Sequence, residues 1–211
     1  MLQSVHAEVT RRALGERVGR RALNAIVASN VRVDDLVNQF GHDAFHFDNN
    51  AFESSRAHID EQRALIRPAL ERGDAGSAWR AFGRLTHTAQ DFYAHSNYVD
   101  LWLACQPNGM RPAAGEIDPL DDTLVENPSL RSGKLYLPLG ILSFIPGLSK
   151  LVMPFLPRDS HAWMNLDSPS CGPLFEYAFE AAVKRTKYEF DLTGSGLGAE
   201  LLSLFRDMTG I

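Results

Sequence analysis

The residues best suited to chemistry lie in one short run, His87 to Asn97, which reads His-Thr-Ala-Gln-Asp-Phe-Tyr-Ala-His-Ser-Asn. Within this run, His87, Asp91 and His95 follow one another at four-residue spacing. On an α-helix each such step rotates a side chain by only about 40°, so the three form one stripe. Imidazole and carboxylate groups are the ligand types that a divalent cation such as zinc takes. The apolar residues around the stripe predict a packed interior, where polar side chains need a partner.

Other histidines of the chain also have a carboxylate near them in the sequence. The chain contains seven histidines. His6 lies at the start of an expected helix, His46 opens the run His46-Phe47-Asp48-Asn49, and His161 precedes Asp167. A single histidine in such a setting is more often structural or solvated than a metal ligand. The stripe is stronger evidence, although by itself it also fits a buried hydrogen-bond network.

Composition and charge restrict the class of protein. A chain of 211 residues is long enough for one domain with a sizeable core. Its net charge of −5 argues against a general nucleic-acid binder, which would show a basic face. Cys105 and Cys171 are too few for a disulfide framework, so we expect two free, buried thiols, with a single disulfide as the alternative.

The N-terminal residues MLQSVHAEVTRRAL lack the apolar stretch of a secretory signal. We therefore expect a cytoplasmic protein, a protein exported by a leaderless route, or a trimmed chain. Membrane association remains open at this stage because of an apolar segment further along the chain.

Hydrophobic spacing predicts an all-α fold, because apolar residues recur at helical intervals and no strand pattern stands out. Asp74 is expected to cap the helix that carries the stripe, and Ser96 with Asn97 is expected to end it. The stretch from Asn30 to Asn50 is expected to be irregular or only partly helical, and residues 105–134, rich in Pro, Gly, Asp and Asn, form a loop. Helices are predicted at residues 4–14, 16–30, 51–72, 77–95 with an extension towards 104, 173–191 and 196–209, with a turn at Thr193-Gly194-Ser195-Gly196.

Residues 135–157, LYLPLGILSFIPGLSKLVMPFLP, are strongly apolar and about as long as a membrane span. Pro138, Pro146, Pro154 and Lys150 argue against a continuous transmembrane helix. Two interpretations stay open for this segment. It forms either two short buried helices, or a lid or hairpin that contacts a membrane surface.

The motifs together resemble the Het-C-like proteins. The string His-Thr-x-Gln-Asp-Phe-Tyr-x-His-Ser-Asn, found here at His87 to Asn97, is a hallmark of that family. Further similar runs follow the family's order and are His6-x3-Thr10, Asn30-x3-Asp34, His46 to Asn49 and His161 to Pro169. The resemblance covers most of the chain, from about residue 6 to 190, and is weakest over 105–157. The Het-C group is in turn distantly similar to zinc-dependent phospholipases C and single-strand-specific zinc nucleases, all-α enzymes with a three-zinc cluster in a cleft.

The resemblance implies a set of metal ligands, position by position. His6 matches a histidine that holds one zinc together with the N-terminal amine, here that of Met1. Asp34 matches a metal-bridging aspartate that also orients or deprotonates the attacking water, which makes it the expected catalytic residue, with Asp35 as the alternative. Asp91 is expected to touch two metals. The full set of expected ligands is His6, Asp34, His46, His87, Asp91, His95, His161 and Asp167.

Two departures from the phospholipase pattern concern the last metal site. Three residues separate Asp91 from His95, where the phospholipases have a longer gap. The phospholipases also place a glutamate one turn after the last histidine. This chain has Asn165 at that position and Asp167 two residues beyond it.

The resemblance implies a phosphodiester hydrolase of the phospholipase C type that uses two or three zinc ions on phospholipid head groups. Residues 1–211 would form one domain, a multi-helix bundle of the zinc phospholipase C type, with residues 105–157 as a loop-rich apolar insertion that touches the membrane. No nucleic-acid partner is expected. Two alternatives remain: a zinc nuclease or phosphatase on the same cluster, and a non-catalytic, metal-braced protein that engages a membrane. The sequence contains no Gly-x-Ser-x-Gly elbow, no P-loop and no His-Glu-x2-His motif that would indicate another mechanism.

Overall fold

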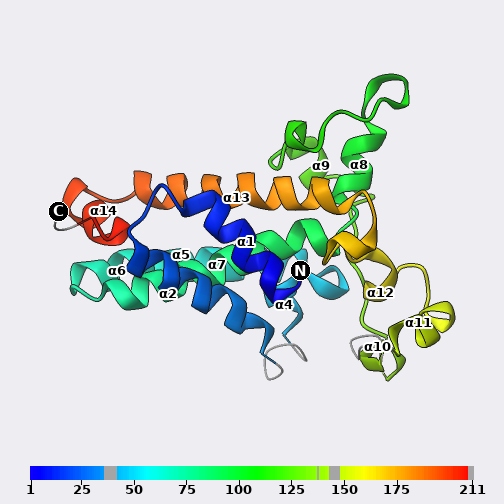
Figure 1. Cartoon of the computed structure of the whole chain (residues 1–211), viewed down its shortest axis with the longest axis horizontal. Coiled ribbons are helices and arrows are strands. Elements are labelled where there is room, and N and C mark those ends of the chain that lie inside the picture. Colours follow the sequence, from blue (N-terminus) through cyan, green and yellow to red (C-terminus); the bar gives the residue numbers. More distant parts are fainter. Residues whose placement is uncertain (36–41, 137, 143–147, 209–211) are drawn as a thin grey trace.

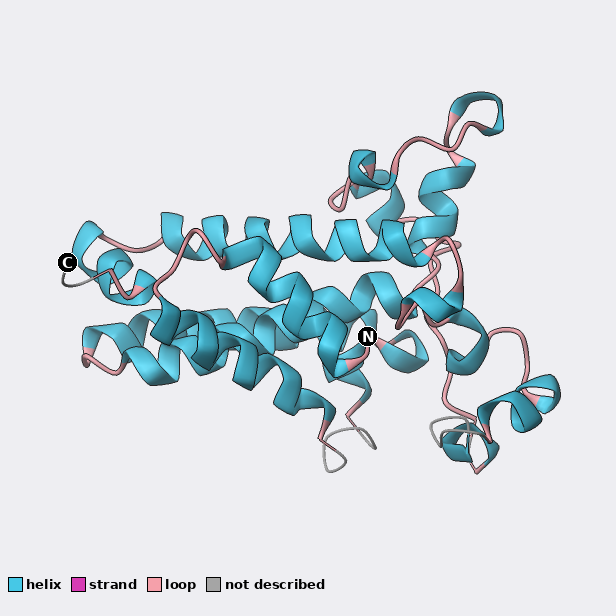
Figure 2. Ribbon diagram, viewed as in Figure 1, coloured by secondary structure: helices cyan, strands magenta, loops and turns pink. Residues whose placement is uncertain are grey.

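The computed structural model describes residues 1–35, 42–136, 138–142 and 148–208. These residues form helices joined by loops, as Figure 2 shows, and among them only isolated β-bridges and no strand occur. The all-α, multi-helix fold predicted from the sequence is therefore confirmed.

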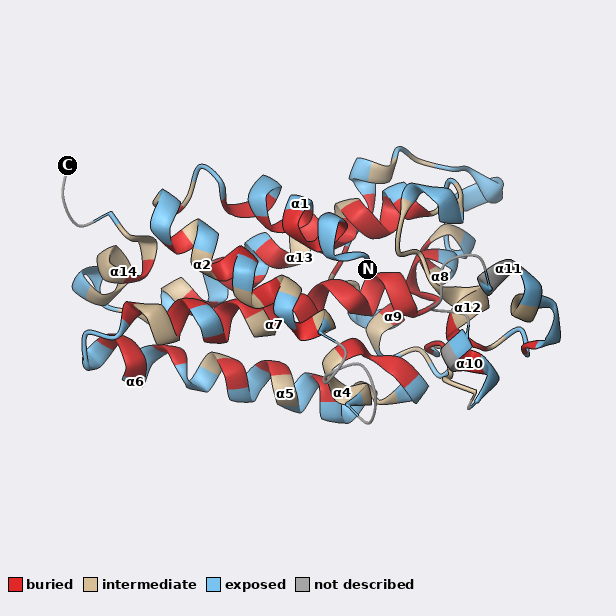
Figure 3. Cartoon of the chain, turned by 60° about the horizontal axis from the view of Figure 1, so that its bottom comes forward, coloured by how far each residue is buried: buried red, intermediate tan, exposed pale blue. Residues whose placement is uncertain are grey.

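One helix, α7 (Ala75–His95), runs through the middle of the bundle and carries the polar stripe. Every residue from Leu85 to Val99 is buried, which Figure 3 shows as a continuous buried band along α7. Helices surround α7 (Figure 1), so its C-terminal half, from Leu85 onward, has no side that faces solvent. Those that pack against it include α1 (Gln3–Leu14), α2 (Arg20–Val31), α5 (Phe52–Ala64), α6 (Ile66–Glu71) and α13 (Phe175–Ser195).

Both ends of α7 follow from local sequence. The Asp74 side chain accepts a hydrogen bond of 2.9 Å from the Ser77 backbone N–H, which confirms the predicted N-cap. The helix ends at Ser96, whose backbone is extended, and α8 (Tyr98–Ala104) begins after Asn97. The side chain of Asn97 does not cap α8. Its oxygen accepts from the Arg131 N–H at 2.8 Å and thereby ties the helix end to the following loop.

The closest contact between α2 and α7 depends on Gly83. A Cβ atom at this position would lie 2.5 Å from the Ile26 carbonyl oxygen, so no other residue fits without moving a backbone. This approach brings Asn30 of α2 within hydrogen-bond distance of α7, where its side-chain N–H₂ donates to Thr86 and to Gln90. The close packing therefore connects α2 to the polar interior beside the stripe.

The predicted helices differ from the observed ones mainly at their ends. The segment predicted at 51–72 is split into α5 and α6 at Leu65, and the two closing helices are α13 and α14 (Ala199–Arg206). The turn expected at residues 193–196 was wrong in part, because α13 continues to Ser195. A Cβ on Gly194 would lie 3.3 Å from the Leu202 side chain of α14, so this glycine makes room for the returning helix. Residue 209 of the last predicted helix lies outside the described residues.

The predicted irregular stretch contains short helical turns. They are η1 (Arg32–Asp34), α4 (Asp43–His46) and η2 (Asp48–Asn50), and residues 36–41 between them lie outside the described residues. The loop at 105–134 likewise holds only η3 (Pro107–Gly109), η4 (Ala114–Glu116) and α9 (Asp122–Val125). The Tyr98 hydroxyl anchors this loop by donating to the Asp118 carbonyl at 2.6 Å.

The apolar segment 135–157 contains two short helices, α10 (Leu139–Leu142) and α11 (Ser149–Val152), followed by η5 (Met153–Phe155). The interpretation of both helices as buried was wrong for the described residues, because Leu151 is 66% exposed and Phe155 78% exposed. The described parts of the segment project beyond the end of the bundle (Figure 1), and Trp163 of the α12 helix (His161–Met164) donates to the Met153 and Leu156 carbonyls at their base. Within the described parts of the chain, none of the helices combines the length and the apolar character that a bilayer span requires.

The two thiols differ from the sequence-based expectation. Cys105 and Cys171 are both free, as expected, but both are exposed rather than buried. Cys105 directly follows α8, and Cys171 is the last residue of the short helix η6 (Pro169–Cys171).

Candidate metal centre

The structure brings all of the predicted ligands together at the C-terminal half of α7. His87, Asp91 and His95 project from α7 itself. The others come from five separate segments: His6 from α1, Asp34 from η1, His46 from α4, His161 from α12 (His161–Met164) and Asp167 from the chain that follows α12. Ion-pair distances connect each of them to at least one of the others.

Asp91 lies at the centre of this group, and its two carboxylate oxygens face different neighbours. Oδ1 lies 3.1 Å from His6 Nε2 and 2.5 Å from the Met1 amine nitrogen. Oδ2 lies 3.0 Å from His87 Nε2 and 3.0 Å from His46 Nδ1. The Asp91 side chain has no solvent exposure. One carboxylate is therefore shared between two sets of nitrogen atoms.

Asp34 lies on the same side as the Oδ2 atom of Asp91, beside His87 and His46. Its Oδ1 lies 3.6 Å from His87 Nε2 and 4.0 Å from His46 Nδ1. One ligand atom each from His6, Asp34, His87 and Asp91 fits within 4.8 Å of the others. Asp35, the alternative to Asp34, instead faces Arg32 at the surface and belongs to no part of the site.

A second set of side chains adjoins the first. His95 Nε2 lies 3.1 Å from Asp167 Oδ1, and His161 Nε2 lies 3.7 Å from Asp167 Oδ2. The main chain positions Asp167, because the Leu166 N–H donates to the Ala94 carbonyl and the Asp167 carbonyl accepts from the Leu2 N–H. Asp167 thus stands where the two histidines converge, although no helical spacing relates it to them.

The orientation of His6 follows from a chain of hydrogen bonds. The Thr186 hydroxyl donates to the Ala182 carbonyl, so it must accept from the Gln90 side-chain nitrogen at 3.0 Å. The Gln90 oxygen is therefore the atom that faces His6 Nδ1 at 2.6 Å, and Nδ1 carries the proton. His6 Nε2 is then a bare lone pair directed at Asp91.

His95 is oriented in the same way by a main-chain acceptor. Its Nδ1 lies 2.8 Å from the His46 carbonyl oxygen, which can only accept, so Nδ1 donates. Its Nε2 atom is directed to the other side, where it lies 3.1 Å from Asp167 Oδ1 and 3.3 Å from the Met1 amine nitrogen. Fixing one ring nitrogen by a second hydrogen bond is the usual way in which proteins prepare a histidine for a metal.

These orientations create a conflict that a cation would remove. The Nε2 lone pair of His6 and the Oδ2 atom of Asp34 are buried without any hydrogen-bond donor. Both face carboxylate or imidazole acceptors, and buried acceptors that face one another are unfavourable. A divalent cation between them would convert this repulsion into attraction, so the residues present fit a metal.

The electrostatics of the first set agree with ligand chemistry. Burial lowers the pKa of His6 and lowers that of His87 to about 4, which keeps both rings neutral. Burial alone would raise the pKa of Asp91, but the Met1 amine and the surrounding histidines outweigh it and hold that pKa well below its usual value. Neutral imidazole and ionised carboxylate are the forms that bind a metal.

In the second set, burial alone would lower the pKa of His161. The nearby carboxylates of Asp48 and Asp167 outweigh burial and raise that pKa to about 10. A proton on this ring takes the place that a cation would otherwise occupy between the two carboxylates. A metal that binds there has to displace that proton.

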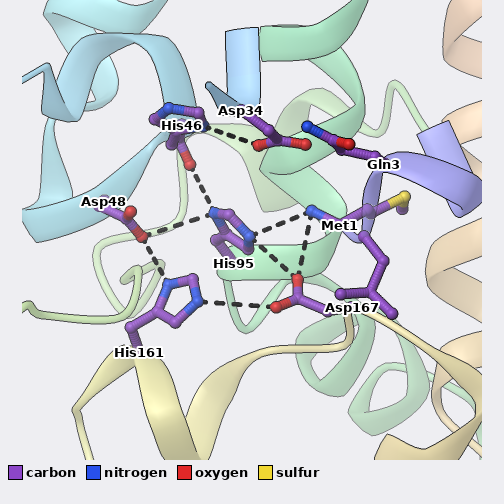
Figure 4. A pocket seen from close by; sticks show the side chains of 9 residues that line it. Met1, Gln3, Asp34, His46, Asp48, His95, His161 and Asp167 are labelled. Atoms are coloured by element: carbon purple, nitrogen blue, oxygen red, sulfur yellow. Dashed lines mark hydrogen bonds and ion pairs between the residues drawn. The ribbon is translucent and has the colours of Figure 1, made fainter. Parts of the chain in front are cut away.

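The second set borders an open cavity of about 180 Å³, shown in Figure 4. Its walls are formed by Met1, Leu2, Gln3, Asp34, His46, Asp48, His95, His161 and Asp167. His6, His87 and Asp91 lie behind this lining and are fully buried. The site is therefore closed on the α7 side and open on the other, as a centre that admits a small ligand must be.

Asp48 is the residue of this site that the sequence did not predict. Its Oδ1 accepts from His161 Nδ1 at 2.9 Å and lies 3.5 Å from His95 Nδ1. The backbone reverses here because Phe47 and Asn49 adopt left-handed conformations, with φ of 56° and 53°. This places both His46 and Asp48 in the site, although they are two residues apart in a short helical region. The sequence held two signals for Asp48: its position two residues after His46, and the asparagines after it, because Asn tolerates that conformation.

Comparison with known proteins gives a family match over the N-terminal half of the chain, which carries most of the candidate site. A family model described as the VWA7 N-terminal domain matches residues 2–114, more than half of the chain. The chain belongs to the VWA7 N-terminal domain family. The matched residues include His6, Asp34 and the complete stripe on α7, whereas His161 and Asp167 lie beyond them. No curated protein and no solved structure matches the chain.

Proposed function

We propose that this protein is a zinc-dependent phosphodiester hydrolase of the phospholipase C type, with two or three metal ions at the α7 site. The observation that carries the proposal is the shared carboxylate of Asp91. Its two oxygens each face imidazole nitrogens at 3.0–3.1 Å in a fully buried setting. The resemblance of the motifs to the Het-C-like proteins, which are similar to zinc phospholipases C, supports the same function.

The residues divide into two adjoining ligand groups. His6, Asp34, His87 and Asp91 form the first, and His46 adjoins it at Asp91 Oδ2. His95, His161 and Asp167 form the second, beside the open cavity. Bound zinc ions would supply positive charge for the non-bridging oxygens of a phosphodiester and would lower the pKa of water towards neutrality.

The cavity needs that charge to bind a phosphate. Asp34, Asp48 and Asp167 line it and would repel an anion by themselves. Asp34 has a buried oxygen without a donor, and burial raises the pKa of its carboxyl group. That oxygen is suited to accept a proton from, or to orient, an attacking water in the cavity.

Lipid is the favoured substrate rather than nucleic acid. The chain has a net charge of −5, so a polyanionic strand would be repelled overall. The exposed apolar side chains at residues 139–155 lie on the segment that leads into His161. These two features suit a phosphodiester that is presented at a lipid surface.

The experiment compares hydrolysis of phosphatidylcholine and of a soluble chromogenic phosphodiester by the wild-type protein and two variants. We expect chelation and His87→Ala each to abolish activity on both substrates, because His87 Nε2 faces both Asp91 and Asp34. His42→Ala is the matched control, since His42 is exposed and contacts Phe45 outside the site. Activity that survives chelation and His87→Ala would contradict the proposal.

Metal analysis of the purified protein adds an independent measurement. Two or three zinc ions per chain would agree with the shared-carboxylate centre. A single ion with four protein ligands would instead indicate a structural brace, because closed four-ligand zinc sites are structural.

A further inference from the structure

The apolar arm, defined here as residues 138–142 and 148–156, exposes an unusual number of large apolar side chains. Those exposed are Leu139, Leu142, Leu148, Leu151 and Phe155. Figures 1 and 3 both show α10 and α11 beyond α12 at one end of the molecule, away from the bundle. Exposed apolar side chains gathered on one segment in this way indicate an interaction surface.

The charge around the arm is opposite in sign to that of the whole chain. Residues 131–159 contain four Lys or Arg and one acidic residue, Asp159, which pairs with Lys134 at 2.8 Å, in a chain of net charge −5. Arg131 and Arg158 are both exposed at the two ends of this stretch. Apolar side chains bordered by cations are the combination that binds the interface of an anionic bilayer. A symmetric contact between two copies would bring these like charges together and is disfavoured.

The arm leaves and rejoins the chain directly at the metal centre. At its start, the Gly133 N–H donates to the His95 carbonyl at 2.9 Å. At its end, the His161 N–H donates to the Lys134 carbonyl at 2.9 Å, and the Asp159 carbonyl accepts from the Lys134 N–H at 2.8 Å. A Cβ on Gly133 would lie 2.6 Å from His161 Cα, so the two ends of the arm meet in close contact. The histidines of the second ligand set therefore stand at the base of the arm.

From this arrangement we propose that the apolar arm inserts into the interface of an anionic phospholipid bilayer and holds the cavity against the head groups. The arm supplies the apolar contact, and Arg131 and Arg158 supply attraction to lipid phosphates. Delivery of a head group to the cavity rests on the proposed function. Binding to the bilayer does not, and it is measured separately.

The experiment uses the full chain with chelator present, so that no lipid is hydrolysed, and measures co-sedimentation with vesicles. Vesicles of phosphatidylcholine with phosphatidylglycerol are compared with vesicles of phosphatidylcholine alone. We expect tighter binding to the anionic vesicles and weaker binding at high salt, because exposed charges are screened. The double variant Leu151→Glu/Phe155→Glu should reduce the partition coefficient by at least about tenfold, since it removes the two most exposed apolar side chains.

Leu65→Glu is the matched control, because Leu65 is a 49% exposed leucine at the junction of α5 and α6. We expect its binding to equal that of the wild type. Circular dichroism and melting temperature verify that both variants fold. Equal sedimentation of the double variant and the wild type, or no binding to either vesicle, would overturn the proposal. The proposal would also be overturned if the only effect of the double variant were to convert a dimer to a monomer.

Activity assays separate this inference from the proposed function. With zinc present, the double variant should retain hydrolysis of a soluble phosphodiester and lose hydrolysis of vesicle lipid. Vesicle binding without any hydrolysis would remove the proposed function and leave the arm's role intact. Hydrolysis of the soluble substrate without vesicle binding would overturn the arm's role and leave the proposed function intact.

Discussion

The candidate metal centre and the apolar arm are neighbours that depart from ordinary burial in opposite directions. At the centre, His6, His87 and Asp91 are polar and fully buried. On the arm, Leu151 and Phe155 are apolar and mostly exposed. Ordinary folding avoids both situations, since buried polar groups need partners and exposed apolar groups cluster away from water. Among the described residues, the Met1 amine pairs with Asp91, whereas His6 Nε2 and Asp34 Oδ2 have no hydrogen-bond partner.

The two regions differ in how firmly the fold holds them. Helices enclose the centre. The side chain of Gln90 on α7 hydrogen-bonds to α1 and to α13 and so holds the three helices together. The arm consists of short helices attached to the bundle at their base. A centre that must keep ligand geometry requires the first arrangement, whereas a surface that adapts to lipid is served by the second.

Asp91→Asn should have the largest effect on zinc binding, because the Asp91 carboxylate faces His6 with one oxygen and His46 and His87 with the other. Zinc at about 1,000 times its dissociation constant should raise the free energy of unfolding of the wild type by about 4 kcal/mol. The variant should lose most of this stabilisation, measured by thermal denaturation with and without zinc. The Leu151→Glu/Phe155→Glu protein should keep it in full. An equal zinc response in Asp91→Asn would remove the distinction between the two regions.

Asp48→Asn should have a smaller effect, confined to the second ligand set. Asp48 accepts from His161 Nδ1 and leaves His161 Nε2 facing Asp167, so it positions that ring. Loss of such a partner should weaken zinc affinity or activity by about 10–100-fold. Titration of metal content against a competing chelator measures this, with Asp35→Asn as the exposed neighbouring control. A loss of all metals would mean that Asp48 acts on both sets.

Tyr98→Phe tests a buried polar group whose partner lies within the chain. Losing its hydrogen bond to the Asp118 carbonyl should lower the free energy of unfolding by about 1 kcal/mol, measured by urea denaturation. Zinc and vesicle binding should not change. This result would separate internally satisfied polar groups from those of the metal centre.

The same tyrosine predicts a loss of stability at alkaline pH. Burial raises the pKa of Tyr98 above its usual value of about 10. A group with a raised folded-state pKa contributes its full stability below the unfolded-state pKa and loses it as pH rises further. The wild type should therefore lose stability above pH ~10, and Tyr98→Phe should lose less. An identical alkaline decline in both proteins would assign the effect to another group.

Much of the fold could be predicted because its signals are local. Periodic apolar residues predicted the main helices, and Asp74 and Ser96 marked the ends of α7 correctly. The end of α13 was not predicted, because glycines usually end a helix, whereas here α13 continues through Gly194 to Ser195, beside the Leu202 side chain of α14. The burial of the thiols was likewise misjudged, and the sequence left two interpretations of the arm open, because exposure depends on which elements cover a segment.

The sequence by itself determined the chemistry of the centre: the types of side chain, their spacing on α7 and their order along the chain. Helical periodicity is enough to place His87, Asp91 and His95 on one stripe. Only the tertiary structure decided between Asp34 and Asp35, added Asp48, and placed the base of the apolar arm against His95 and His161. Those choices depend on left-handed turns and on main-chain hydrogen bonds between distant segments, which residue types and spacing do not encode locally.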